Sequence, residues 1–192
     1  MFFDSSKGNC VGCISVYKKA SDIRLIAMQG TIYFSSSGKL TYNCPVQADY
    51  WVDYSRFNPY NDGLRADTIN SLTFQTMGNH GAHILLQSNN IDFNNSEVEI
   101  VIGGWFNNRS VIRGQQQGPT LSNYTGSVLS GSSFRWFWIS WNGGCVKVGK
   151  DSAVGDSKIL EWCGLSFPIN GIRFGYCCGS GGTFIIPIRH SH

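Results

Sequence analysis

The chain has 192 residues and a formal net charge of +3, and only 14% of its residues are charged. Its 23 glycines and its aromatic content of 14% exclude an intrinsically disordered chain and argue against a protein of long helices. No run of Lys and Arg could neutralise successive phosphates, so nucleic acid is not expected as a partner, and no apolar run approaches the ~18 residues of a membrane helix.

Most segments alternate apolar and polar residues with period two, which is typical of half-buried strands. The pattern of residues 30–43 predicts a hairpin, and residues 15–28 are the best candidate for an amphipathic helix. Further strands are expected at 71–77, 97–102, 134–141, 145–148, 172–176 and 183–188. Short strands separated by turn signals predict an all-β fold, namely a jelly-roll-like antiparallel β-sandwich with disulfides.

Two of these strands carry more specific expectations. In residues 97–102 every second residue from Val98 is apolar, so we expect one buried face and one wet face that bears Glu97 and Glu99. Residues 134–141 are apolar on both faces, which predicts either an interior strand or one whose outer aromatics meet a partner or ligand.

Seven cysteines indicate structural disulfides in an oxidising compartment. Cys10 and Cys13 lack a second pair at zinc-ribbon spacing, because Cys177 and Cys178 are adjacent. Seven is odd, so at least one cysteine is free or bonded to another chain, and a disulfide-linked homodimer is one hypothesis. We expect a Cys-bearing segment over residues 1–45, packed on or flanking a sandwich domain over residues 46–192.

Three Asn-x-Ser/Thr sequons begin at Asn94, Asn108 and Asn123. Like the cysteines, they favour a secreted protein. The first residues lack the apolar stretch of a signal peptide. We therefore expect a secreted protein whose signal has been removed, and a cytosolic protein is the alternative.

Two stretches carry a family resemblance. Residues 99–113 (EIVIGGWFNNRSVIR) and 137–149 (FWISWNGGCVKVG) resemble, in order and separation, the two signatures of the farnesoic acid O-methyltransferase-like domain family. Weaker similarity occurs at Tyr60, at 79–86 and at 160–162, so the resemblance spans about residues 50–178. It implies a β-sandwich of a kind found mainly in secreted or multi-module invertebrate proteins, and a lectin-type member that recognises rather than converts its ligand.

The family name implies a methyl transfer that the residues do not support. A donor such as S-adenosylmethionine is usually held by a glycine-rich turn between a strand and a helix in an α/β sheet. This chain has no βαβ pattern, and Gly103 and Gly104 lie in an all-β context before Trp105. We therefore expect no enzymatic activity and keep a methyltransferase as the less favoured alternative.

The histidines offer little support for catalysis or metal binding. His80 and His83 are three residues apart, which on a strand places the two rings on opposite faces. Nucleophilic catalysis needs a base beside a Ser or Cys, and the four histidines come without a nucleophile elbow.

Two loops concentrate carboxylate and amide oxygens, of which calcium takes about 6–8 in flexible geometry. The first loop contains Asn61 and Asp62, and the second contains Asp92 and Asn94. These four residues are the candidate calcium ligands. Neither loop has EF-hand spacing, and turns naturally collect Asn, Asp and Gly, so plain turns are the alternative.

Trp105, Asn107 and Arg109 follow a strand end and point to sugar recognition. An aromatic face covers the C–H face of a pyranose, while planar polar side chains bond its hydroxyls. The alternative is that these residues only fix a turn and a core. Because no charge cluster suits an anionic sugar, we expect a dimeric lectin that binds a neutral hexose of galactose type, with calcium as a candidate ligand. The alternative is an extracellular adhesion or structural module.

Overall fold

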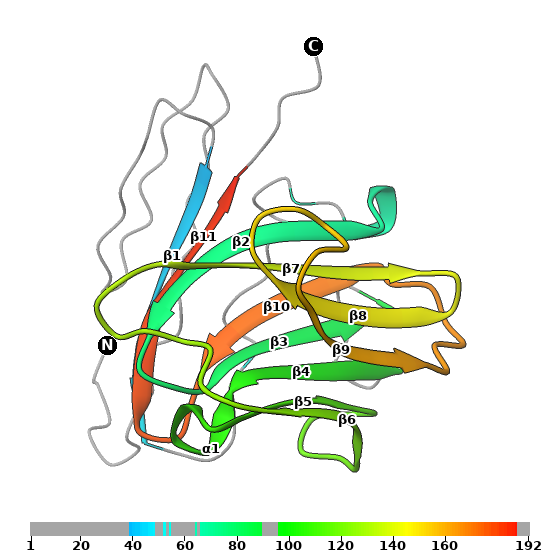
Figure 1. The fold of residues 1–192 in the computed structure, drawn as a ribbon. Coiled ribbons are helices and arrows are strands. Elements are labelled where there is room, and N and C mark those ends of the chain that lie inside the picture. The colour runs from blue at the N-terminus through cyan, green and yellow to red at the C-terminus, as the bar shows by residue number, and fades with distance from the viewer. Residues whose placement is uncertain are drawn as a thin grey trace, which may run out of the picture.

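In the computed structural model, the described residues are 39–48, 52, 54, 64, 66–89 and 96–187. They form eleven strands, one short 3-10 turn at Ala66–Thr68 and one further turn, α1 (Gly104–Asn107), as Figure 1 shows. The strands make two antiparallel sheets that face each other, which confirms the predicted β-sandwich with disulfides.

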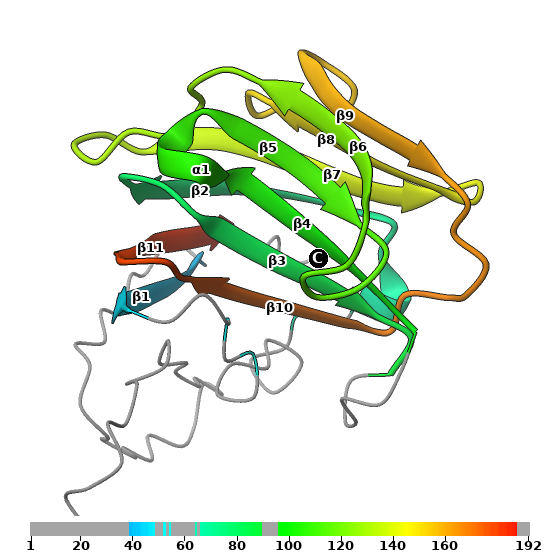
Figure 2. The same cartoon turned by 90° about the horizontal axis from the view of Figure 1, so that it is seen from below.

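The six-stranded sheet contains, in spatial order, β1 (Lys39–Gln47), β11 (Ser180–Pro187), β2 (Ser71–Gly78), β7 (Arg135–Asn142), β8 (Cys145–Lys150) and β9 (Lys158–Cys163). The five-stranded sheet contains β10 (Gly171–Tyr176), β3 (Ala82–Gln87), β4 (Glu97–Gly103), β5 (Arg109–Arg113) and β6 (Thr120–Thr125). Figure 2 shows the five-stranded sheet as one layer in front of the other.

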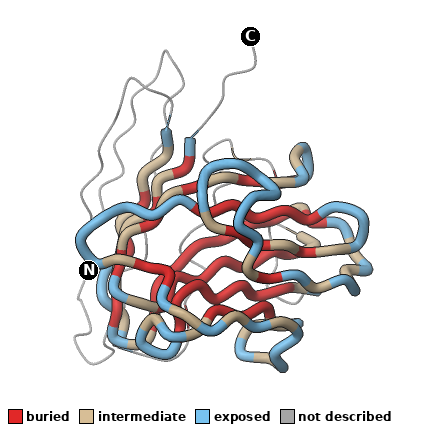
Figure 3. Tube along the Cα trace, viewed as in Figure 1, coloured by how far each residue is buried: buried red, intermediate tan, exposed pale blue. Residues whose placement is uncertain are grey.

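The core lies between the two sheets. Phe74 of β2 is fully buried, and its ring centroid is 6.0 Å from those of Phe137 and Phe184 in its own sheet. It is also 6.0 Å from Phe174 of β10, so this ring joins the two layers. Figure 3 shows buried residues along the inner strands and exposed residues in the connecting loops. Burial of apolar surface in this layer is the main stabilising contribution.

The strands expected at 71–77, 97–102, 134–141, 145–148, 172–176 and 183–188 are confirmed as β2, β4, β7, β8, β10 and β11. β1 covers the second half of the expected hairpin, and the helix expected at 15–28 lies outside the described residues. The strands β3, β5, β6 and β9 were not expected from periodicity.

The wet face expected on β4 is wrong. Glu99 is fully buried and Val101 is 2% exposed, although both point away from the core between the sheets. Val52 and Tyr54 explain the burial, because they form a second buried cluster with Leu85 on this outer face. The alternation of apolar and polar residues along one strand cannot predict that a segment distant in the sequence covers the outer face of that strand.

β7 is an interior strand, paired with β2 on one side and β8 on the other. Its outer face is covered by the chain itself at Trp138, which is 1% exposed and donates a hydrogen bond from Nε1 to the Asp156 carbonyl oxygen (2.7 Å). A Cβ at Gly149 would lie 2.3 Å from the Trp138 ring, so glycine on β8 makes room for this indole.

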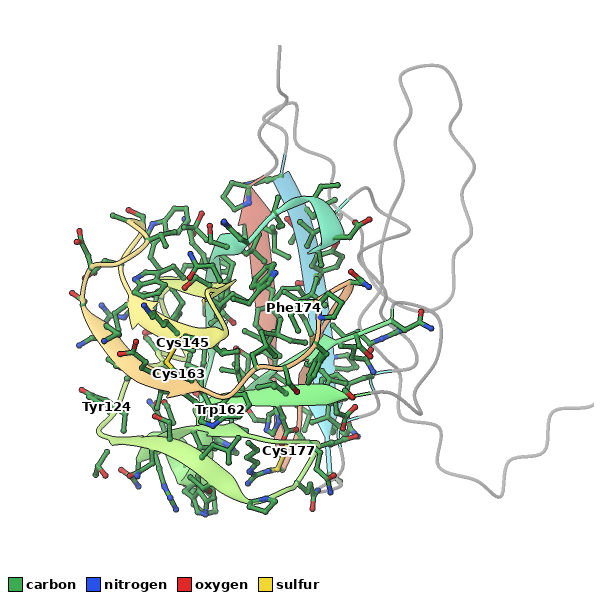
Figure 4. All side chains as sticks on the ribbon, turned by 90° about the vertical axis from the view of Figure 1, so that its right-hand side faces the viewer. Tyr124, Cys145, Trp162, Cys163, Phe174 and Cys177 are labelled. Atoms are coloured by element: carbon green, nitrogen blue, oxygen red, sulfur yellow. A yellow bond between two sulfur atoms is a disulfide. The ribbon has the colours of Figure 1, made fainter. Side chains whose placement is uncertain are left out.

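Two disulfides join described cysteines. Cys145 and Cys163 are register partners on β8 and β9, and their bond clamps the end of this strand pair, whereas Cys177 and Cys178 are sequence neighbours. Cys44 is also disulfide-bonded. Figure 4 labels Cys145, Cys163 and Cys177.

The division of the chain at residue 45 stays a prediction, and this position falls inside β1. β1 pairs along its length with β11, so residues on both sides of position 45 belong to the same strand pair. Within the ranges given above, no helix has the length and apolar character needed to cross a membrane.

Candidate functional site

The connection between β4 and β5 is a left-handed turn. Trp105 and Phe106 have φ/ψ values of 50°/56° and 55°/43°, and Gly103 before them has φ 60°. Each non-glycine residue in this region costs about 1–2 kcal/mol, because its Cβ approaches the following carbonyl oxygen. Such strain persists only where the surroundings hold it, and it concentrates at binding and catalytic sites.

The side chain of Asn107 holds this turn. Its Oδ1 accepts hydrogen bonds from the backbone N–H groups of Val128 (3.1 Å) and Leu129 (2.9 Å). Its Nδ2 donates to Ser127 Oγ (2.8 Å) and to the Leu129 carbonyl oxygen (2.9 Å). The hydrogen-bonding capacity of the amide is therefore used against the 127–129 loop. Asn107 itself has φ 67°, a conformation that Asn adopts more readily than most residues.

Gly103 is the other residue that this turn requires. Its N–H donates to Ser110 Oγ (3.0 Å), and its φ lies in the left-handed region. A Cβ at this position would lie 2.7 Å from both Asn107 Oδ1 and Leu129 Cδ1. The close approach and the positive φ together favour glycine here.

The turn places two aromatic side chains at the surface. Trp105 is 46% exposed and Phe106 is 82% exposed. The guanidinium carbons of Arg109 and Arg113 lie 4.9 and 5.4 Å from the Trp105 ring centroid, within the range of a cation–π interaction. The Phe106 ring centroid is 5.3 Å from that of His80. Both exposed rings therefore have neighbours that orient them.

A pocket of about 260 Å³ lies among these groups. Its lining comes from the residues before β3, from β3 and β4, from the turn, and from the segments at and after the ends of β5 and β10. The lining residues are His80, Gly81, His83, Val101, Gly104, Trp105, Phe106, Arg113, Gln117 and Cys178. The pocket thus combines exposed aromatic rings with imidazole, guanidinium and amide groups.

Both histidines border this pocket, so the expectation that they lie on opposite faces is wrong. β3 begins at Ala82, and His80 precedes it in a bend. The alternation of a strand therefore does not apply to the step between the two histidines.

The three predicted sugar-binding residues take different places. Trp105 lines the pocket, Arg109 lies over the Trp105 ring, and the Asn107 amide is engaged within the turn. Their contact with a sugar stays a prediction. Phe106 and Arg113 were missed, although Phe106 follows Trp105 directly and an exposed aromatic pair in a turn is a usable signal.

A buried carboxylate, that of Glu99, lies behind the pocket. Its Oε1 accepts a hydrogen bond from the Tyr54 hydroxyl (3.0 Å) and is 3.1 Å from His83 Nδ1. Its Oε2 accepts from Arg113 Nη1 (2.9 Å) and from the Gln117 N–H (3.0 Å). Three of these four donors line the pocket, so Glu99 fixes much of its polar surface.

These partners control the ionisation of Glu99. Burial by itself raises the pKa, but the hydrogen bond and charge of His83, the Gln117 N–H and the Arg113 charge outweigh it and lower the pKa from 4.5 to about 2. Burial, followed by the negative charge of Glu99, raises the pKa of Tyr54 well above its usual value. At pH 7 the carboxylate is ionised and the Tyr54 hydroxyl donates to it.

The predicted calcium ligands Asn61, Asp62, Asp92 and Asn94 lie outside the described residues. Within the described part of the chain, two clusters have the spacing of metal ligands, and both are built mainly from cysteines. They are His83 with Cys177 and Cys178, and Glu161 with Cys145 and Cys163. Neither is the oxygen-rich set that calcium prefers.

A second and larger pocket, of about 520 Å³, is lined in part by the 127–129 loop. Besides residues 127–129, it is lined by Phe134–Phe137, Lys150 and Asp151. Phe134 and Trp136 are 38% and 36% exposed, so this pocket also offers aromatic surface. It shares the loop that Asn107 anchors.

Residues 48–187 match the family described as farnesoic acid O-methyltransferase, and the chain belongs to this family. The protein named "Uncharacterized protein 5" from Haliotis asinina is 41% identical over 101 residues, which are 52% of this chain. The aligned part is 58% of that relative, so the chain spans a little over half the length of the curated relative it matches.

Two of the solved structures that this chain resembles share little sequence with it. A carbohydrate-binding module from Bacillus subtilis is 10% identical at a TM-score of 0.44, over 78% of this chain and 80% of that one. A prokaryotic β-1,3-1,4-glucanase from a mouse hindgut metagenome is 10% identical at a TM-score of 0.42, over 81% of this chain and 96% of the other.

The family description implies a methyl donor, and the described residues do not form the usual site for one. Every strand pair in the described residues is antiparallel, whereas the nucleotide-binding turn belongs to a parallel α/β sheet. Gly103 and Gly104 lead into a strained left-handed turn and not into the N-terminus of a helix that could bind a charged cofactor.

Replacing Asn107 with alanine should lower the free energy of unfolding by about 3 kcal/mol. The change leaves buried backbone groups of the 127–129 loop unpaired and puts alanine in a left-handed conformation. Urea denaturation measures the difference. Asn108→Ala at the next, exposed position is the matched control and should change stability by less than about 0.5 kcal/mol. Equal effects of the two substitutions would contradict the role of Asn107.

The stability contributed by Glu99 should depend on acid pH. A carboxyl whose pKa is lowered by folding stabilises the protein above its unfolded pKa of 4.5, and this contribution is lost as the pH falls toward 2. Between about pH 5 and pH 2 the wild type should therefore lose about 3 kcal/mol more than Glu99→Gln does. Chemical denaturation across this range is the measurement.

The control for this pH dependence is Glu161→Gln. Glu161 is an exposed carboxylate that forms ion pairs with Lys147 and Lys158 on the surface. Exposed ion pairs contribute little, so its pH profile should follow that of the wild type. Parallel profiles for wild type and Glu99→Gln would show that the buried network does not stabilise the ionised carboxyl.

Proposed function

We propose that this protein binds carbohydrate in the pocket beside the β4–β5 turn and does not act as an enzyme. One observation carries the proposal. Trp105 and Phe106 are exposed in a strained left-handed turn, directly beside a pocket that also presents His80, Arg113 and Gln117. A core-forming or solubilising role requires neither the strain nor two exposed aromatic rings.

The lining matches the chemistry of a sugar. An aromatic face covers the C–H face of a pyranose, and planar amide, imidazole and guanidinium groups bond its hydroxyls in fixed directions. At about 260 Å³, the pocket is smaller than the roughly 300–1,000 Å³ that a drug-sized ligand requires, which favours one sugar residue over a longer segment.

The charges favour a neutral hexose, with a galactose-type sugar as the preferred ligand. The positive charge of Arg113 is offset by Glu99, which lies 2.9 Å away. Arg109 lies over the Trp105 ring and is not part of the lining. The low net charge of +3 is consistent with this preference.

Recognition is favoured over turnover by the acid–base groups of the site. Glycoside hydrolysis generally uses two carboxyl groups about 5–10 Å apart. The described residues that line the pocket include no carboxylate, and the nearby Glu99 is committed to its four hydrogen-bonding partners.

Secretion and dimerisation complete the proposal. The disulfides Cys145–Cys163 and Cys177–Cys178 support an oxidising compartment. Single sugar sites are weak, and a homodimer, disulfide-linked through the odd cysteine, would supply the avidity that two sites give.

Trp105→Ala should weaken binding on a glycan array by at least about tenfold, since it removes the stacking surface. On the same array, the wild type should give a stronger binding signal with galactose-terminated glycans than with glycans that end in other neutral hexoses. Trp136→Ala is the matched control, because Trp136 is also a partly exposed tryptophan and lines the second pocket. This variant should bind as the wild type does.

Two results would count against this reading. Loss of binding in Trp136→Ala, with Trp105→Ala unaffected, would move the site to the second pocket. An array with no glycan signal from the wild type would favour an extracellular adhesion module whose aromatic side chains contact another protein.

We propose calcium as a second ligand of this protein, bound at Asn61 and Asp62 or at Asp92 and Asn94. Calcium at 100 times its Kd should raise the free energy of unfolding by about 2.7 kcal/mol, and EDTA should reverse the gain. Asp62→Asn and Asp92→Asn, made separately, identify the loop. If neither substitution alters the effect of calcium, both loop assignments are wrong.

A further inference from the structure

The Cys177–Cys178 disulfide joins a buried sulfur to one that borders the pocket. Cys177 is fully buried directly after β10, whereas Cys178 is partly exposed and belongs to the pocket lining. Cys178 also has φ 67°, a left-handed conformation that is uncommon for a residue with a side chain. The two sulfurs of one bond therefore face different surroundings.

The buried sulfur of Cys177 contacts the imidazole of His83, which in turn contacts the carboxylate of Glu99. Cys177 Sγ lies 3.2 Å from His83 Nε2, and His83 Nδ1 lies 3.1 Å from Glu99 Oε1. An ionised carboxylate only accepts hydrogen bonds, so Nδ1 carries the hydrogen in this contact. Sulfur, imidazole and carboxylate follow one another in the order of a nucleophile, its base and the group that orients the base.

This arrangement suits a cysteine that is released from its disulfide. A disulfide sulfur has no hydrogen to give to Nε2, whereas a Cys177 thiol donates to a neutral His83 and a Cys177 thiolate accepts from a protonated one. The contact of Nδ1 with Glu99 fixes the ring so that Nε2 faces Cys177 Sγ. The donors to Glu99, Tyr54 and Arg113 among them, keep the carboxylate ionised and in place.

We propose that Cys177–Cys178 is a redox-active disulfide that undergoes thiol–disulfide exchange, with Cys178 as the attacked sulfur and Cys177 as the leaving group that His83 protonates. The co-reactant is a dithiol reductant that enters through the pocket. This activity is separate from carbohydrate binding and does not depend on it.

The exchange proceeds in two steps. A thiolate of the reductant attacks Cys178 Sγ, the bond between the two cysteines breaks, and its electron pair passes to Cys177 Sγ. His83 takes up a proton from solvent at Nε2 and passes it to this sulfur, while the hydrogen on Nδ1 stays in the bond to Glu99. The second thiolate of the reductant then attacks its own sulfur in the mixed disulfide and releases Cys178, which is protonated by solvent. Two electrons have passed from the dithiol to the protein, and the reductant leaves as a cyclic disulfide.

The same chain supplies an internal control in Cys145–Cys163. Cys145 is partly exposed and Cys163 is exposed, so solvent access to this disulfide is at least as good. Its neighbour in the same cluster is the Glu161 carboxylate, which is paired with Lys147 and Lys158, and this cluster contains no imidazole. No ring nitrogen in this cluster can therefore pass a proton to a leaving sulfur, as His83 Nε2 can for Cys177.

The test is timed reduction of the intact full-length protein with dithiothreitol. Free thiols are alkylated at each time point, and peptide mapping by mass spectrometry locates them. Cys177 and Cys178 should become alkylated about tenfold faster than Cys145 and Cys163. With glutathione as the reductant, the trapped adduct should be on Cys178. A slower or equal rate, or an adduct on Cys177, would overturn the proposal.

His83→Asn tests the role of the imidazole. The asparagine amide can still donate toward Glu99 but has no group at the position of Nε2. Reduction of Cys177–Cys178 should slow about tenfold, while that of Cys145–Cys163 stays at the wild-type rate. An unchanged rate at Cys177–Cys178 would refute the role of His83. If both disulfides react faster because the variant has unfolded, the wild-type rates and the position of the glutathione adduct decide the question.

Discussion

The buried carboxylate of Glu99 is the interaction on which the candidate site depends. An ionised carboxylate without partners in the interior costs several kcal/mol, so its environment must supply donors. Here the donors come from three separate parts of the chain: Tyr54, His83 of β3, and the end of β5 with the residues that follow it. Satisfying one charge therefore fixes the relative position of these segments. The shape of the pocket and the orientation of its imidazole both follow from that requirement.

The β4–β5 turn differs from the Glu99 network, because its own backbone conformation is unfavourable and other contacts must hold it in place. The left-handed residues Trp105 and Phe106 are unfavourable by themselves, and the hydrogen bonds of Asn107 to residues 127–129 offset that cost. The 127–129 loop also forms part of the second pocket. One side chain therefore holds both the aromatic turn and a loop that lines the second pocket.

The sandwich could be predicted from the sequence because the signal for a strand is local. Alternation from Val98 to Ile102 identifies both the strand and its core-facing side. What covers the opposite side is not local, since one partner of Glu99 at this face is Tyr54, 45 residues earlier. Of the pocket residues, Trp105 could be found because it stands beside planar polar residues after a strand. The approach of Cys177 to His83 could not be found, because it requires the pairing of β10 with β3 and joins residues 94 positions apart.

The pairing of the first described strand with the last has a consequence for how this domain can be carried by other proteins. In the β1–β11 pair, Lys39 at the start of β1 lies opposite Pro187 at the end of β11. Figure 1 shows these two strand ends side by side at the top of the view, with the α1 turn at the bottom. A domain whose chain enters and leaves at one point can be inserted into a loop of a host protein with little disturbance to the host fold. Held in this way, it would present its aromatic turn away from the host.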